Sequence, residues 1–222
     1  MQADFSVELG PDAPALEIPW RSDDPRVRYY DLKNHPELVQ QIPEVIAFPE
    51  LGAFLTRMNA TGFPLATAKC DTWLSNEVDP EEEVFGDRKF VSYVDLIFVD
   101  EADQRSFEKH EAFSRELCRL LSHAPEIAAT VELVIRHCYY RQENTAQSQD
   151  TFSSQNKQPQ LDNDCSLKNE PRWAPADSSS GFCITAYVTG FGDAEHEPVR
   201  LWMIGINLLQ HAIVQLNRNS LA

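Results

Sequence analysis

Charged and aromatic side chains recur on one side of the β-like stretches of this sequence, and they are the residues best suited to bind a ligand or a partner. Successive strand residues point to opposite faces of a sheet, so residues two apart share a face. On this basis eight residues form a candidate ligand or partner face: Lys69, Asp71, Trp73, Tyr93, Asp95, Arg136, Tyr140 and Tyr187. Four of them are large aromatics, which is more than a purely solvated face needs.

Three occupants of this face are compatible with the sequence. The N-terminal segment of the chain could cover it through Trp20, Tyr29 and Tyr30. Another protein, or a second copy of the chain, could dock on it. A small molecule could bind between sheet and N-terminal segment, in a site that uses Lys69, Asp71, Asp95 and Tyr140.

Asp71 and Asp95 are the residues of this face with the clearest chemical potential. Two carboxylates on adjacent strands raise one another's affinity for protons, or hold a cation with Lys69 as a counter-charge. The alternative is ordinary cross-strand ion pairing of these aspartates with Lys69 and Arg136.

Other chemical motifs are weak. His137 and Cys138 are adjacent in a strand and therefore point to opposite faces, so the imidazole cannot activate the thiol. The acidic run 193–197 precedes a helix, where carboxylates favour the helix dipole. Nucleotide-binding glycine motifs, zinc-type cysteine pairs and nucleophile motifs do not occur. We predict no catalytic residue, no metal site and no cofactor.

The amino-acid composition argues against two classes of partner. The chain has 222 residues and a formal net charge of −16, without a cluster of lysine and arginine that could bind phosphates. Nucleic acid and anionic membranes are therefore not expected as partners. The N-terminus lacks the basic and apolar regions of a secretory signal, and the apolar segment 201–216 is interrupted by polar residues. We expect a soluble, cytoplasmic protein with reduced cysteines.

A helix-strand-strand pattern occurs twice and defines the fold. The apolar spacing predicts helices over 49–59, 103–122 (with Asp103 as N-cap) and 198–217, and strands over 65–75, 90–99, 131–141 and 182–190. This predicts an α+β fold: an antiparallel sheet of at least four strands with helices on one face, built from two helix-strand-strand units plus a C-terminal helix.

The face beneath the helices is predicted to be apolar. The set assigned to it is Ala66, Ala68, Cys70, Leu74, Val94, Leu96, Phe98, Leu133, Ile135, Ile184 and Val188, whereas Thr67, Glu132 and Thr185 fall on the candidate face.

Two regions flank or interrupt this body. Residues 1–35 carry frequent prolines and predict an extended arm, with a possible edge strand at 27–32. Residues 36–222 predict a single α+β domain. It is interrupted by a low-complexity insertion at 143–180, rich in Gln, Ser, Asn and Asp, which we expect to be disordered or loosely attached.

In the order of its elements, the stretch 49–217 resembles the class I chaperones of type III secretion. The resemblance rests on topology and carries no residue over. It implies a dimer that binds extended partner segments without catalysis. The chain departs from that pattern in its proline-rich arm, its long insertion and a missing third strand in the first half.

The leading hypothesis is a non-enzymatic, cytoplasmic protein-binding or chaperone-like domain, with a homodimer or a protein partner at the candidate face. The alternative is a small-ligand-binding protein or an enzyme that uses carboxylates on the sheet face. A third possibility is a scaffold whose function lies in the 143–180 insertion as a tether.

Overall fold

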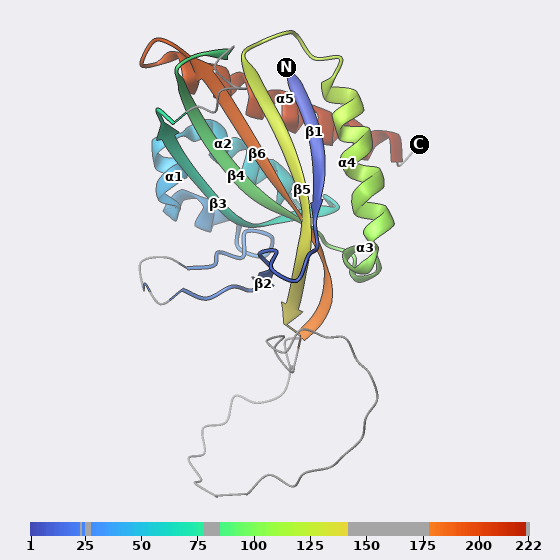
Figure 1. The fold of residues 1–222 in the computed structure, drawn as a ribbon. Helices are drawn as coiled ribbons and strands as arrows, with labels where there is room; N and C mark the ends of the chain where they lie inside the picture. The colour runs from blue at the N-terminus through green and yellow to red at the C-terminus, as the bar shows by residue number, and fades with distance from the viewer. Residues whose placement is uncertain (23, 25–27, 78–84, 142–177, 221–222) are drawn as a thin grey trace, which may run out of the picture.

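The structure is a computed structural model, and a mixed sheet of six strands forms its centre (Figure 1). It describes residues 1–222 except 23, 25–27, 78–84, 142–177 and 221–222. The strand order is β1-β5-β6-β4-β3, and β2 also pairs with β5. The bounds are β1 Gln2–Glu8, β2 Leu16–Ile18, β3 Leu65–Ser75, β4 Arg88–Phe98, β5 Ala129–Arg141 and β6 Ser178–Gly192.

Helices pack against one face of this sheet. They are the 3₁₀ helix η1 (Pro36–Gln41), α1 (Pro43–Ala47), α2 (Pro49–Met58), α3 (Glu101–Arg105), α4 (Phe107–Leu121) and α5 (Glu197–Ser220). In Figure 1, α2 and α5 lie behind the strands and α4 stands beside β1. Among the described helices, none combines the length and hydropathy needed to cross a membrane.

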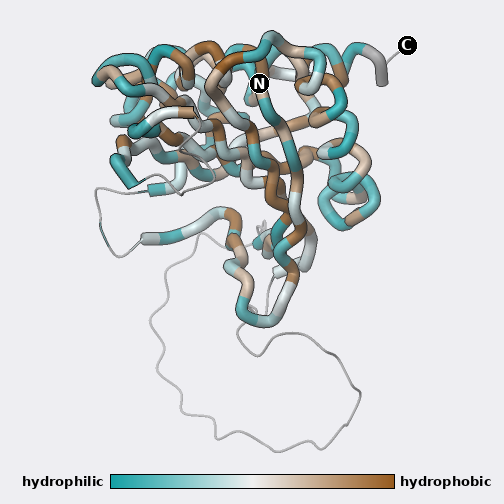
Figure 2. The backbone as a smooth tube through the Cα atoms, turned by 45° about the horizontal axis from the view of Figure 1, so that its top comes forward, coloured by the Kyte–Doolittle hydropathy of each residue, from teal (hydrophilic) through white to brown (hydrophobic). Residues whose placement is uncertain are grey.

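The predicted fold class is confirmed. The units α2-β3-β4 and α4-β5-β6 follow one another, and α5 closes the order by packing on the sheet. The described β3, β4, β5 and β6 are antiparallel to their neighbours within this group. Polar and apolar residues are interleaved along the chain (Figure 2), as expected for elements that each turn one side to a core.

Trp202 of α5 anchors the core on the helix side. Its side chain is completely buried, its Nε1 donates to Ser92 Oγ at 2.8 Å, and its ring packs on Phe48 and Phe90. A Cβ atom at Gly190 would lie 2.3 Å from the backbone nitrogen of Trp202. Glycine at this position of β6 therefore lets α5 approach the sheet closely enough to insert the indole.

The first helix of the second unit begins differently from the prediction. Asp103 is not its N-cap. Asp100 caps the short α3 by accepting from the amides of Ala102 and Asp103, and Ser106 caps α4 by accepting from the amide of Lys109. Asp100 and Ser106 are both of residue types that favour the N-cap position. Because Ser106 is not helical and lies between α3 and α4, the predicted helix is split in two.

The N-terminal arm contributes two strands to the sheet. β1 and β2 pair one after the other with β5, both in parallel. The predicted edge strand at 27–32 is wrong where it can be compared, because residues 28–32 form no strand and 25–27 lie outside the described residues. Apolar residues do alternate with polar ones in β1, at Ala3, Phe5 and Val7, and this alternation is typical of a strand. Ala3 and Phe5 pack against the core.

A β-bulge in β3 reverses part of the predicted face assignment. Between Thr67 and Cys70 the register shifts, since three steps along β3 match two along β4. Ala66 and Ala68 therefore lie on the face away from the helices, against the prediction. Thr67 lies on the helix side, where its Oγ1 accepts from Asn59 Nδ2 at 2.7 Å.

Each outer strand of the sheet, β1 and β3, carries an aspartate whose side chain accepts a hydrogen bond from the backbone amide of the next residue. Asp4 of β1 accepts a hydrogen bond from the amide of Phe5 at 2.7 Å, and Asp71 of β3 accepts one from Thr72 at 2.7 Å. Each N–H is thus occupied by a local acceptor and is not presented to another strand.

The predicted insertion at 143–180 lies outside the described residues, apart from 178–180 at the start of β6.

Lys33 holds the segment that joins the arm to the body. Its ammonium donates to three carbonyl oxygens, those of Ala60 at 3.1 Å, Phe63 at 2.7 Å and Leu65 at 2.9 Å. Partial burial lowers the pKa of this amine. The three bonds tie residue 33 to the loop between α2 and β3.

Replacing this ammonium should destabilise the fold measurably. Lys33→Met keeps most of the apolar stem but removes all three charge-assisted donors, so we expect the free energy of unfolding to fall by about 2 to 3 kcal/mol. Urea denaturation followed by circular dichroism measures it. Lys109→Met, which removes a surface pair with Asp103, should cost at most about 1 kcal/mol. Equal losses in the two variants would contradict the role of Lys33.

Candidate functional site

The arm covers one end of the sheet face that points away from the helices. Leu16, Ile18 and Tyr29 pack there on a small apolar cluster of the sheet. Its sheet members are Ala66, Ala68, Ile97, Cys138, Tyr140 and Cys183. Tyr140, one of the eight predicted residues, is therefore buried, and its hydroxyl donates to the carbonyl of Phe182 at 2.7 Å.

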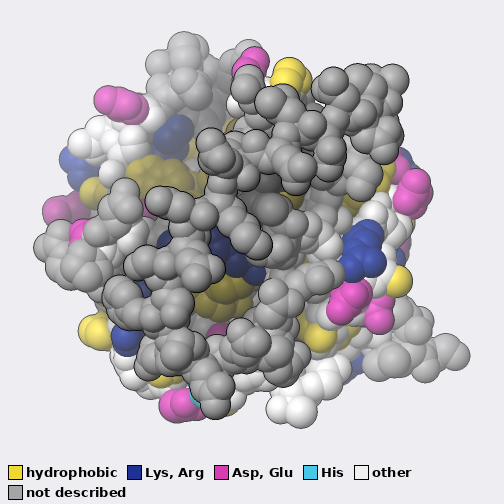
Figure 3. All heavy atoms as spheres, turned by 90° about the horizontal axis from the view of Figure 1, so that it is seen from below, with side chains coloured by type: hydrophobic (Ala, Val, Ile, Leu, Met, Phe, Trp, Pro, Cys, Tyr) yellow, Lys and Arg dark blue, Asp and Glu magenta, His cyan; other side chains and the backbone are white. Residues whose placement is uncertain are grey.

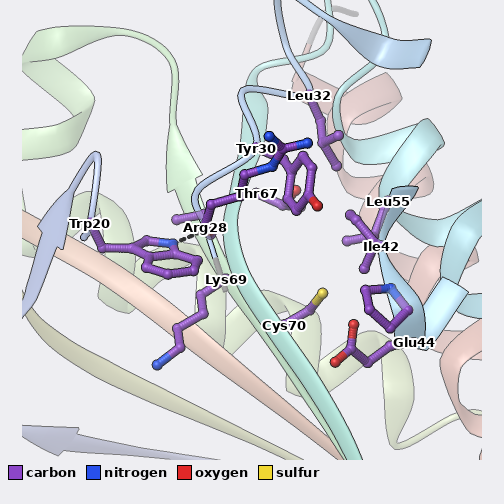
Figure 4. A pocket seen from close by; sticks show the side chains of 12 residues that line it. Trp20, Arg28, Tyr30, Leu32, Ile42, Glu44, Leu55, Thr67, Lys69 and Cys70 are labelled. Atoms are coloured by element: carbon purple, nitrogen blue, oxygen red, sulfur yellow. Dashed lines mark hydrogen bonds between the residues drawn. The ribbon is translucent and has the colours of Figure 1, made fainter. Parts of the chain in front are cut away.

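The three aromatic residues of the arm have different roles. Trp20 Nε1 donates to the carbonyl of Ala68 at 2.8 Å, and its ring meets Tyr29 edge to face at 6.4 Å. Trp20 and Tyr30, unlike Tyr29, also line a cavity of about 110 Å³ between the arm, α1 and β3 (Figure 4). Cys70 points into this cavity, where burial and the nearby Glu44 raise the pKa of the thiol to about 12.

The rest of the face carries a row of three aromatic rings from three strands, the aromatic row. Trp73 of β3 lies 6.3 Å from Tyr93 of β4, and Tyr93 lies 5.9 Å from Tyr187 of β6. Tyr93 and Tyr187 are directly opposite in register, as are Tyr187 and Glu132. Trp73 keeps 40% of its surface exposed. Lysine and arginine side chains lie beside hydrophobic ones on the underside of the molecule (Figure 3).

A hydrogen-bonded chain runs from β1 across this face to β4. Glu8 accepts from Arg136 Nε at 2.9 Å, and Arg136 Nη1 donates to Thr185 Oγ1 and to the Tyr187 hydroxyl, both at 3.2 Å. Thr185 in turn donates to Asp95 Oδ1 at 2.6 Å. The guanidinium of Arg136 also lies over the Tyr187 ring, 5.7 Å from its centroid. Four strands are thus connected through polar side chains.

Asp95 and Asp71 have different environments. Asp95 is 6% exposed, and desolvation raises the pKa of its carboxyl, against the opposing effects of the Thr185 bond, Arg136 and Lys69. Asp71 is exposed, and its cross-strand neighbour is Tyr93. The geometry therefore does not join the two as a carboxylate pair.

A cavity of about 310 Å³ brings five of the eight predicted residues together. Lys69, Tyr93, Asp95, Arg136 and Tyr187 line it. Pro14, Ala15 and Leu16 of the arm form a further wall. The Lys69 ammonium lies 5.7 Å from the ring of Trp20 and 6.0 Å from that of Tyr93. No described carboxylate lies within ion-pairing distance of it.

The remaining predicted residues lie elsewhere. Trp73 lines a neighbouring cavity, Asp71 is outside both, and Tyr140 is beneath the arm. Glu8 was not among the predicted residues, although it completes the contacts of Arg136. The alternation of residue types around Glu8 could have predicted a strand there. It could not have predicted the pairing of that strand with β5, because the two are more than a hundred residues apart and such a pairing leaves no local pattern.

His137 and Cys138 lie on opposite faces, as predicted. The imidazole stacks on Phe182 on the helix side, whereas Cys138 is buried in the cluster beneath the arm. Within the described residues, no group of three or more His, Cys, Asp and Glu is placed to hold a metal ion.

Comparisons with protein-family models, with curated proteins and with solved structures found no match for this chain. The geometry of the face is therefore the basis for any functional assignment.

The charge of Asp95 should leave a signature in the pH dependence of stability. Because its folded-state pKa is raised, the folded protein keeps this proton after the unfolded chain has lost it. The contribution of Asp95 to stability therefore declines as pH rises from about 3.8 through the folded-state pKa. The loss is about 1.4 kcal/mol for each pH unit that separates the unfolded-state pKa from the folded-state pKa. Asp95→Asn keeps the acceptor for Thr185 and should gain stability relative to the wild type across that range.

Urea denaturation at several pH values between 4 and 8 measures this difference. Asp71→Asn removes an exposed carboxylate on the same face and is the control for the loss of one negative charge. A wild-type to Asp95→Asn difference that stays constant, or falls as pH rises, would contradict the assigned environment.

Proposed function

We propose that this chain is a non-enzymatic binding domain that holds an extended segment of a protein partner on the part of the sheet face left open by the arm. The observation that most supports this is the aromatic row, with Trp73 40% exposed beyond the end of the arm's coverage. Tryptophan, tyrosine and arginine are the residues that contribute most at protein interfaces.

The side chains around the row are suited to holding a partner rather than to breaking a bond. The Cys70 thiol lies on the helix side of β3, away from the row, and it is protonated at neutral pH, since its pKa is about 12; a thiol is a poor nucleophile. His137 packs on the helix side, away from the open face. Arg136 is held by Glu8, Thr185 and Tyr187, which fixes its position on the surface.

The element order shared with class I secretion chaperones adds a partner class to the proposal. Those proteins bind extended segments and form dimers, so a second copy of this chain is one partner that we include. The net charge of −16 opposes self-association through long-range repulsion, which favours a different protein.

A second candidate function is small-ligand binding, or catalysis by carboxylates, in the cavity that holds Lys69, Asp95 and Arg136. The buried Asp95 and the volume of about 310 Å³ favour it. It differs from the first proposal in its dependence on Asp95 and Lys69 rather than on Trp73.

Loss of the Trp73 indole should weaken binding of a partner segment. We expect random twelve-residue peptides selected against the wild-type chain to bind at least about tenfold more weakly to Trp73→Ala, because tryptophan is the residue type most enriched at binding hot spots. Isothermal titration calorimetry measures the dissociation constants. Leu74→Ala is the matched control, since this 51% exposed neighbour points to the other side of β3.

Light scattering of the purified chain tests the second copy as partner. A dimer that dissociates in Trp73→Ala but persists in Leu74→Ala would identify a second copy of the chain as the partner bound at the open face. A monomer for which no peptide is selected would contradict the proposed function.

A further inference from the structure

The neighbouring cavity lined by Trp73, of about 420 Å³, lies over the sheet at the exposed end of the aromatic row. Trp73 and Tyr187 line it from β3 and β6, and Val91 of β4 lies between those strands. Glu77 and Glu132, both exposed, contribute carboxylates to its lining. The cavity thus combines aromatic and apolar surface with acceptors for hydrogen bonds.

We infer that this cavity receives the guanidinium group of an arginine side chain carried by the partner segment. The inference rests on the proposed function, because it names the chemistry of the segment that the open face would bind. It adds a specific contact at Trp73, Tyr187 and Glu132.

The aromatic walls fit a planar cation. A cation is attracted to the face of an indole or phenol ring at distances up to about 6 Å from the ring centre. This protein already places two guanidinium groups over phenol rings, since Arg136 lies 5.7 Å from the centre of the Tyr187 ring and Arg28 lies 4.9 Å from that of Tyr30. Trp73 has no such described cation over it and is 40% exposed, so its ring is available to a partner.

The carboxylates fit the same group. Glu132 is directly opposite Tyr187 in register, which puts a carboxylate beside the aromatic wall. A guanidinium offers parallel N–H donors that match the two oxygens of a carboxylate while its flat face stacks on a ring. An ammonium group cannot do both, so arginine suits the cavity better than lysine.

The charge balance also favours a cation. Among the described lining residues, two glutamates stand against one lysine, Lys89. Over the whole chain the net charge is −16, which attracts basic segments and repels acidic ones and phosphates.

A peptide titration followed by NMR tests the inference. The probe is acetyl-Thr-Val-Thr-Arg-Val-Thr-amide, and the control peptide replaces arginine by citrulline, which has nearly the same shape without the charge. The signal is the indole N–H resonance of Trp73, assigned through Trp73→Phe. We expect this resonance to move on titration, with a dissociation constant at least about tenfold lower for arginine than for citrulline, and lysine in between.

Two variants check the contact on the protein side. Glu132→Gln should weaken binding of the arginine peptide by about threefold or more and should leave the citrulline peptide unchanged. Glu101→Gln, which removes an exposed carboxylate in α3 beyond the other end of β4, should change neither. Raising the salt concentration from 50 to 300 mM should weaken binding of the arginine peptide and leave the citrulline peptide unchanged.

The outcomes separate the inference from the function on which it rests. Peptides that need Trp73 but bind equally with arginine and citrulline would overturn the inference and leave the binding function standing. Tight binding of free acetyl-arginine amide, within twofold of the peptide, would overturn the assignment to a protein segment and indicate a small guanidinium compound. Binding that is unchanged in Trp73→Ala would overturn both.

Discussion

The parallel pairing of the N-terminal strands with β5 is the constraint on which the candidate face depends. β1 ends at Glu8, opposite Arg136, and so supplies the carboxylate that holds this arginine. The chain then continues past Pro14 and Ala15 to β2, which pairs with the next part of β5 and places Leu16 and Ile18 on the apolar cluster. One strand edge therefore determines where the face is covered, where it is polar and where it stays open.

The order of helices and strands could be predicted because each long element has an apolar pattern of its own period. Other features depend on information that no such pattern contains. One additional residue in β3 moves Ala66 and Ala68 to the other face, and nothing in their types marks the bulge. Ser106 and Asp103 are both good N-caps, so the choice between them depends on how α3 and α4 pack.

Strand alternation could place the eight candidate residues on one side of a sheet but could not say what lies on them. Tyr140 has the same pattern as Tyr187, yet the arm buries the first and leaves the second half-exposed. Asp71 and Asp95 also differ in exposure, since Asp71 is exposed on an outer strand and Asp95 is buried on an inner one. Burial by a segment far away in the sequence, rather than residue type, decides which of these side chains meets solvent.

The aspartates at the two sheet edges also affect how the protein behaves at high concentration. An unpaired strand edge is a template on which further chains can add and grow into cross-β fibrils. Asp4 and Asp71 each occupy a backbone donor at an outer strand and place a negative charge there, so copies of this chain repel one another where they would otherwise stack. Under the proposed binding function, this repulsion would keep a chain with exposed aromatic rings dispersed until its partner binds.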